Sequence, residues 1–127
     1  MKRRSLLLGF LCAILAPASA WAGERPFDRA AFDKALAEGK PVIVDFYADW
    51  CPTCKAQKPH VLSILSEPRM KDVILFVADY DKERDLKRSL RVTQQSTFVV
   101  FKGGKEVARS TGQTKREDLA ALFAKAL

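Results

Sequence analysis

The chain has 127 residues, of which 48% are hydrophobic and 29% are charged, and its formal net charge is +7 at pH 7. This length and balance predict one globular domain and exclude both a disordered chain and a protein that lies mostly within a membrane. The basic surplus does not indicate a nucleic-acid-binding surface, because three basic residues stand in the first four positions and the others alternate with acids, as in Asp81–Arg88.

The chain opens with the pattern of a cleaved export signal. A basic head, Lys2-Arg3-Arg4, precedes an apolar stretch from Leu6 to Ala16, and Ala20-Trp21-Ala22 places small residues where signal peptidase accepts them. The apolar stretch is shorter than the roughly 20 residues that a transmembrane helix needs, which favours cleavage over a membrane anchor. We expect a signal peptide over residues 1–22, a mature domain over residues 23–127 and a periplasmic location. Sec and twin-arginine export both stay open.

The first half of the mature chain predicts a helix, a buried strand and a second helix. Apolar residues recur at helical spacing from Pro26 to Gly39. The run Val42–Tyr47 is continuous and rich in β-branched and aromatic residues, which predicts a central strand buried on both faces. From Cys51 to about Ser66 the pattern is again helical, and Pro59 within it predicts a kink.

The second half predicts a strand, an exposed helix and a hairpin. Val73 to Ala78 is an apolar run of strand length, and the mixed charges from Lys82 to Leu90 are typical of a solvated helix. Thr97–Phe101 predicts a third strand. Gly103-Gly104 then predicts a tight turn into a fourth, antiparallel strand, Glu106–Arg109.

The chain closes with an amphipathic helix. Thr114 and Glu117 have the spacing of a capping box, and apolar residues at helical spacing follow them. The predicted order of elements is α-β-α-β-α-β-β-α, in which helical crossovers join parallel strands and the last two strands form a hairpin at one edge. The predicted fold class is therefore α/β, with a central mixed β-sheet flanked by helices.

Two cysteines, Cys51 and Cys54, stand between the central strand and the helix that follows it. A thiol at a helix start lies near unpaired backbone N–H groups and the positive end of the helix dipole, which stabilise its thiolate. Cys51 is therefore the expected nucleophile. Cys54, one helical turn later, is placed to resolve a mixed disulfide by forming the Cys51–Cys54 bond. The pair predicts a thiol:disulfide oxidoreductase that uses no cofactor or metal.

A Cys-x-x-Cys pair also has other uses. Structural zinc needs four ligands, and His60 is the only further sulfur or imidazole candidate in the mature chain, which disfavours zinc. A permanent disulfide is disfavoured because so short a loop constrains the unfolded chain little. A copper-carrying dithiol, or a partner-docking module whose redox exchange is incidental, stays open.

Asp45 stands inside the apolar run of the predicted central strand. Burial without a cationic partner raises the pKa of a carboxyl group, which makes Asp45 a candidate proton acceptor for Cys54. An exposed carboxylate at a strand end is the alternative. We also expect the ring of Trp50 to cover part of the site.

The segment Val42–Lys55, with Pro59 five residues after the second cysteine, resembles the thioredoxin superfamily, and the similarity spans about Phe27 to Leu127. Gly39-Lys40-Pro41, the Ala-Asp-Trp-Cys sequence that ends at Cys51, and Ala78-Asp79 are similar to the exported, carboxy-terminal thioredoxin-like domain of the disulfide reductase DsbD. The resemblance implies a thioredoxin fold.

The resemblance also implies roles for particular residues. Cys51 becomes the attacking thiol, Cys54 the resolving thiol and Asp45 the buried acid. The residues expected to contact substrate lie beside the pair and in the loop before the third strand: Trp50, Pro52, Thr53, Gln95, Ser96 and Thr97.

The likeness to DsbD favours a reductant. We also expect the exported protein to be a monomer with no nucleic-acid partner. Such a protein receives electrons from a membrane donor of the DsbD type and passes them to disulfides of exported proteins or to apocytochromes. A periplasmic oxidant or isomerase is the alternative, because similar folds span about −270 mV to about −120 mV. The Pro52-Thr53 dipeptide does not decide between these directions.

Two positions depart from the family pattern. The family usually has a cis-proline before the threonine that opens the third strand, whereas this chain has Ser96 there, so we expect Ser96 to be either strained or trans. We also expect Ser96 to alter partner choice or to admit a metal. The lysine that accompanies the buried acid in typical thioredoxins is replaced by Val77, which should leave Asp45 dependent on water or backbone donors.

Overall fold

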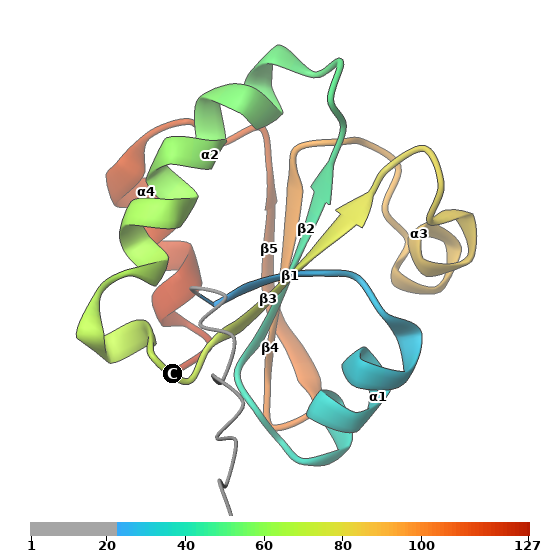
Figure 1. Ribbon diagram of the computed structural model, residues 1–127, viewed down its shortest axis with the longest axis vertical. Helices are drawn as coiled ribbons and strands as arrows, with labels where there is room; N and C mark the ends of the chain where they lie inside the picture. The colour runs from blue at the N-terminus through green and yellow to red at the C-terminus, as the bar shows by residue number, and fades with distance from the viewer. Residues whose placement is uncertain (1–22) are drawn as a thin grey trace, which may run out of the picture.

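The computed structural model describes residues 23–127, and the predicted signal peptide, residues 1–22, lies outside them. Over the described range the elements are, in chain order, β1 (Glu24–Pro26), α1 (Arg29–Ala37), β2 (Val42–Tyr47), α2 (Pro52–Leu65), the 3-10 helix η1 (Pro68–Met70), β3 (Ile74–Asp79), α3 (Arg84–Leu90), β4 (Thr97–Lys102), β5 (Lys105–Thr111) and α4 (Arg116–Ala124). The strands form a sheet of order β1-β3-β2-β4-β5. Helices α2 and α4 cover one face of this sheet, and α1 and α3 cover the other (Figure 1).

The sheet is mixed, as the sequence predicts. β2 pairs parallel to β3 on one side and antiparallel to β4 on the other, and β5 extends β4 as an antiparallel edge strand. β1 forms the opposite edge, parallel to β3. The sequence did not predict β1, because Glu-Arg-Pro carries no apolar pattern. Backbone hydrogen bonds at both ends of β1 hold it against β3. The N–H of Leu75 donates to the carbonyl oxygen of Gly23 over 2.7 Å, and the N–H of Phe27 donates to the carbonyl oxygen of Val77 over 2.9 Å.

β2 separates two hydrophobic cores because its side chains alternate between the faces of the sheet. Ile43 packs into the core under α2 and α4, whereas Val42, Val44 and Phe46 pack into the core under α1 and α3. All four are fully buried, as a continuous apolar strand predicts. Asp45 follows the alternation onto the α2 side, so the fold places a carboxyl group inside the first of these cores.

The ends of two helices show how local chemistry sets element boundaries. Asp28 caps α1, accepting a hydrogen bond from the N–H of Ala31 over 3.1 Å. The predicted capping box at Thr114 and Glu117 is wrong: α4 begins at Arg116, its N-cap is Lys115, and no side chain caps it. The acids Glu117 and Asp118 in its first turn instead complement the helix dipole.

The turn between β4 and β5 has the predicted chemistry. Both Gly103 and Gly104 have positive φ, at 59° and 79°, and Lys102 pairs with Lys105 across them. A two-residue hairpin of this kind needs φ above zero at both positions, which glycine adopts without strain. Within residues 23–127, no helix has the length and apolar character needed to cross a membrane.

Candidate active site

The two cysteines lie at the junction between β2 and α2. Cys51 has an extended backbone and is the N-cap of α2, and Cys54 lies in the first turn of the helix. The N–H of Cys54 donates to the Sγ atom of Cys51 over 3.1 Å. The sulfur therefore accepts the capping hydrogen bond that the side-chain oxygen of a serine accepts at other N-caps. Both cysteines are free thiols, and each is only 1% exposed.

The two thiols have different acidities. Burial alone would raise the pKa of Cys51, but hydrogen bonds from the Cys54 thiol, the Ser96 hydroxyl and the backbone N–H groups of α2 hold that pKa below its ordinary value. Burial raises the pKa of Cys54, and its hydrogen bond to Cys51 raises it further. This arrangement makes Cys51 the more acidic of the two thiols, so Cys51 ionises before Cys54.

Ser96 reaches both sulfurs from the loop before β4. Its Oγ atom lies 3.1 Å from Sγ of Cys51 and 3.2 Å from Sγ of Cys54. Within residues 23–127 every peptide bond is trans, so the trans state anticipated as one of two possibilities is the one found. The backbone is nevertheless strained, because Ser96 has φ of 62°, a region that serine seldom adopts.

Backbone hydrogen bonds fix Ser96 in this conformation. Its N–H donates to the carbonyl of Phe46 on β2 over 2.9 Å, and its carbonyl accepts from the N–H of Gly112 over 3.0 Å. The side chain is 2% exposed. Ser96 is thus held beneath the dithiol and turned toward the sulfurs.

Asp45 is buried, with 2% of its surface exposed, and it lies on the β2 face that α2 covers. Burial raises the pKa of Asp45 to about 7. The Lys58 ammonium lowers this pKa, and the Glu24 carboxylate raises it. The carbonyl of the next residue, Phe46, lies 4.0 Å from Sγ of Cys54, which packs the resolving thiol against the same strand. The alternative of an exposed strand-end carboxylate is wrong.

The expectation that Asp45 lacks a cationic partner is also wrong. Lys58, on α2, places its Nζ atom 4.0 Å from Oδ2 of Asp45 and forms an ion pair with Glu24 on β1. Val77 pairs with Asp45 across β2 and β3, as its place in the family pattern implies, but the positive charge comes from the helix instead. Among residues 23–127, no hydrogen-bond donor reaches Oδ1 of Asp45.

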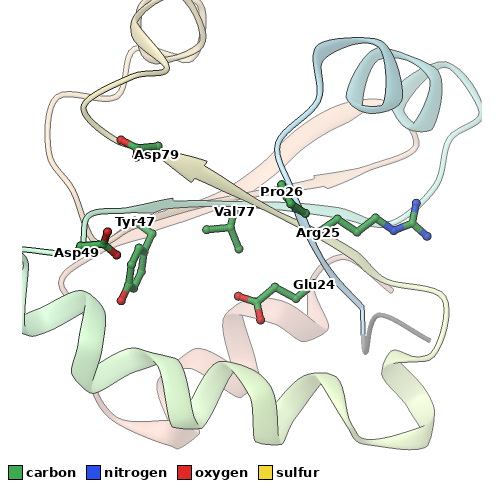
Figure 2. Close-up of a pocket in the computed structure, with 7 residues that line it drawn as sticks. All are labelled: Glu24, Arg25, Pro26, Tyr47, Asp49, Val77 and Asp79. Carbon is green, nitrogen blue, oxygen red and sulfur yellow. The ribbon is translucent and has the colours of Figure 1, made fainter. Parts of the chain in front are cut away.

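A hollow of about 310 Å³ opens beside this charged group, between β1 and the ends of β2 and β3. Figure 2 shows Glu24 and Tyr47 pointing from the sheet toward α2 with Val77 between them, while Arg25 points away. Nζ of Lys58 lies 4.7 Å from the centroid of the Tyr47 ring, which adds a cation–π contact to its pairing with Glu24. The hollow therefore brings solvent close to the Glu24–Lys58 pair.

The residues predicted to contact substrate divide into an exposed and a buried group. Trp50 is 57% exposed, and its indole N–H donates to Oδ2 of Asp81 over 2.7 Å. Pro52 is exposed and Thr53 half-buried beside the dithiol. These three residues form the accessible rim, whereas Ser96 lies below it.

The other two predicted contacts flank Ser96. Gln95 is half-buried. Thr97 is buried, and its hydroxyl donates to the carbonyl of Gln94 over 2.8 Å and lies 2.8 Å from the hydroxyl of Thr111. Thr97 therefore ties β4 to β5, and its hydroxyl is engaged away from the sulfurs.

Gln57 is a site residue that the sequence analysis missed. It is buried on α2 one turn after Cys54, and its Nε2 atom donates to the carbonyls of Gln113, over 2.7 Å, and Ser96, over 3.5 Å. Its spacing from Cys54 and Val61 puts it on the buried face of the helix, and an amide at such a position indicates a polar partner. Gln57 thereby joins α2 to the two loops that support the dithiol.

The described residues also bear on metal binding. Within residues 23–127, no three His, Cys, Asp or Glu side chains gather into a cluster that could hold a metal ion. His60 is half-buried on α2 and takes no part in the dithiol contacts given above.

Comparison with known proteins agrees with this geometry. The sequence pattern of the thioredoxin family matches residues 25–125. The chain is 37% identical over 81 residues to thioredoxin-1 of Saccharomyces cerevisiae, which covers 64% of this chain and 77% of that protein. It is 35% identical over 85 residues to the bifunctional thioredoxin reductase/thioredoxin of Mycobacterium leprae, covering 67% of this chain and 18% of that protein.

Solved structures show the same fold. The crystal structure of Trxlp from Edwardsiella tarda superimposes with a TM-score of 0.77 at 38% sequence identity, covering 79% of this chain and 97% of that one. The predicted thioredoxin fold is thereby confirmed. The chain belongs to the thioredoxin family and is a thioredoxin-type thiol:disulfide oxidoreductase with the redox pair Cys51 and Cys54.

Proposed function

We propose that this protein is an exported reductant that transfers electrons from a membrane donor of the DsbD type to disulfides of exported proteins or to apocytochromes. The observation that supports the reductive direction is the likeness to thioredoxins over residues 25–125, because thioredoxin lies at the reducing end of the range of potentials for this fold. The unequal acidity of the dithiol, with the pKa of Cys51 lowered and that of Cys54 raised, supports Cys51 as the attacking and Cys54 as the resolving thiol. The M. leprae relative, a bifunctional thioredoxin reductase/thioredoxin, supports electron supply by a reductase.

The reaction proceeds through a mixed disulfide. The Cys51 thiolate attacks one sulfur of the partner disulfide, forms a mixed disulfide and releases the first partner thiolate. Asp45 then accepts the proton of Cys54, and the Cys54 thiolate attacks the sulfur of Cys51. The Cys51–Cys54 bond forms, the second partner thiolate leaves, and two electrons have passed from the dithiol to the partner.

Substrate contact falls to the rim around the dithiol. Trp50, Pro52 and Thr53 are the accessible groups there, and the loop of Gln95, Ser96 and Thr97 closes the other side of the sulfurs. Each sulfur is almost completely covered, so the partner disulfide must enter between this rim and the loop. An extended segment of a partner protein meets that requirement.

The reduction potential of residues 23–127 tests the direction of electron flow. The protein is equilibrated in defined thiol/disulfide buffers, Trp50 fluorescence reports its state, and alkylation of free thiols checks the result. A value of about −270 to −200 mV supports a reductant, whereas a value near −120 mV contradicts it and supports an oxidant. If no reversible two-electron transition occurs and copper(I) is retained under reducing conditions, the copper-carrying alternative replaces the redox proposal.

Export is tested separately with the full chain. We expect cell fractionation to place the protein in the periplasm and mass spectrometry to find Gly23 as its first residue. A chain that keeps residues 1–22 in the cytoplasm contradicts the export proposal without affecting the chemistry of the dithiol.

A further inference from the structure

The hydroxyl of Ser96 occupies a position from which it serves two sulfurs. Its Oγ atom is almost equally far from Sγ of Cys51, at 3.1 Å, and Sγ of Cys54, at 3.2 Å. A serine hydroxyl has a single proton and can also accept hydrogen bonds. It can therefore donate to only one sulfur at a time while it accepts from the other.

The backbone of Ser96 gives no reason for a serine at this position. With φ of 62°, glycine would be the unstrained choice, and a β-carbon there has a conformational cost. Both backbone polar groups are already bonded, to Phe46 and Gly112, and any non-proline residue could make those bonds. A strained residue with a buried side chain directed at reactive atoms indicates a role for that side chain.

The acidities of the two thiols set the direction of the hydrogen bond in the reduced protein. Because Cys51 is the more acidic thiol, it ionises first, and in that state the Ser96 hydroxyl donates to the Cys51 thiolate and accepts from the Cys54 thiol. Once Cys51 has attacked, its sulfur belongs to a neutral disulfide and is a poor acceptor. The hydroxyl is then free to rotate and donate to Cys54, whose thiolate must form for the second step.

We propose that Ser96 is a catalytic residue whose hydroxyl stabilises the Cys51 thiolate during attack and then the Cys54 thiolate during resolution. This role rests on the assignment of Cys51 as attacking and Cys54 as resolving thiol in the proposed function. Ser96 loses no proton in either step, so the proton of Cys54 still goes to Asp45. The two electrons still pass from the dithiol to the partner disulfide.

Two substitutions separate the hydroxyl from the backbone strain. Ser96→Gly removes the hydroxyl and relieves the positive φ, whereas Ser96→Ala removes the hydroxyl and keeps the strain. Arg91→Gly is the matched control, because Arg91 also has a positive φ, of 55°, but ends α3 away from the dithiol. An effect shared by the two Ser96 variants and absent from Arg91→Gly belongs to the hydroxyl.

The measurement uses reduced protein mixed rapidly with dithiobis(nitrobenzoate). This disulfide releases one coloured thiolate when Cys51 attacks and a second when Cys54 resolves the mixed disulfide. We expect both phases to slow by roughly tenfold in Ser96→Gly and Ser96→Ala, and the pH midpoint of Cys51 alkylation by iodoacetamide to move upward. Arg91→Gly should match the wild type in both respects.

The outcomes discriminate between the claims. If Ser96→Gly keeps the wild-type midpoint and both phases, the hydroxyl has no catalytic role. If only the first phase slows, Ser96 serves Cys51 alone and the handover to Cys54 is wrong. If the wild type releases no second equivalent, the assignment of Cys54 as resolving thiol fails, whatever the Ser96 variants do.

Discussion

Lys58 on α2 places its ammonium nitrogen 4.0 Å from Oδ2 of Asp45 on β2. This pair crosses from helix to sheet, and Lys58 is shared with Glu24 on β1. The buried acid thus has a cation close enough to lower its pKa, but that cation is partly neutralised by a second carboxylate. The charge state of Asp45 therefore depends on three separate elements of the fold.

Replacing Asp45 with asparagine should slow turnover at neutral and alkaline pH. Asparagine cannot accept the proton of Cys54, and general-base catalysis of this kind contributes roughly 10²-fold or more. Stopped-flow measurement with dithiobis(nitrobenzoate) should show an unchanged attack phase and a slower resolution phase. The difference should shrink below about pH 7, where the wild-type carboxyl is protonated. An unchanged resolution rate would remove Asp45 from the mechanism.

The same carboxyl group should make stability depend on pH. The folded protein holds the Asp45 proton up to about pH 7, whereas the unfolded chain releases it near the ordinary value of 3.8. The unfolded state then binds fewer protons between these values, so the free energy of unfolding should fall as pH rises from about 4 to about 7, by at most about 4 kcal/mol.

Denaturant titrations across this pH range provide the measurement. Asp45→Asn cannot ionise, so its free energy of unfolding should lack this decline and exceed that of the wild type above pH 7. Parallel pH curves for the two proteins would show that Asp45 titrates normally.

Substitutions of Lys58 and Glu24 should move the pKa of Asp45 in opposite directions. Lys58→Gln removes a favourable positive charge and should raise that pKa. Glu24→Gln removes a negative charge and leaves Lys58 to Asp45 alone, which should lower it. Carbon-13 NMR of the Asp45 carboxyl group, with Asp45→Asn used to assign the signal, measures both. Shifts in the same direction would contradict the shared-cation arrangement.

The two glycines of the β4–β5 turn should differ in their tolerance of alanine. Gly103→Ala adds a methyl group with no heavy atom within 4 Å, so it should cost only the strain of positive φ, about 1 kcal/mol. At Gly104 the added carbon would lie 2.9 Å from the backbone carbonyl oxygen of Leu36, so Gly104→Ala should cost at least about 1 kcal/mol more. Thermal unfolding of the pair measures this difference, and equal losses would place the turn away from α1.

The sequence predicted the parts of the site that depend on local patterns. A continuous apolar strand followed by Cys-Pro-Thr-Cys places the dithiol at a helix start, and the position of Asp45 inside that strand favoured a buried acid over an exposed one. Contacts between distant segments were not predictable in the same way. Lys58 reaches Asp45 only because α2 packs across β2, and Glu24 joins them only through β1, a strand held by backbone hydrogen bonds. Spacing along the chain carries no signal for either contact.

Ser96 shows the same limit at a single residue. Its departure from the family pattern identified the position as unusual, but the sequence could not say which way the backbone would turn. The positive φ arises from tertiary bonds to Phe46 and Gly112, which belong to different strands and loops. The placement of its hydroxyl between two sulfurs follows from that conformation and so became visible only in the structure.

The edge strand β1 also affects how the protein should be prepared. Glu24, which pairs with Lys58, is the second residue of the predicted mature chain, so an affinity tag fused directly before Gly23 would add charge and bulk next to this ion pair. The carboxyl terminus lies beside the far end of α2 from the dithiol (Figure 1), and Leu127 is exposed. Tags should therefore follow Leu127, so that measured potentials and pH profiles belong to the native site.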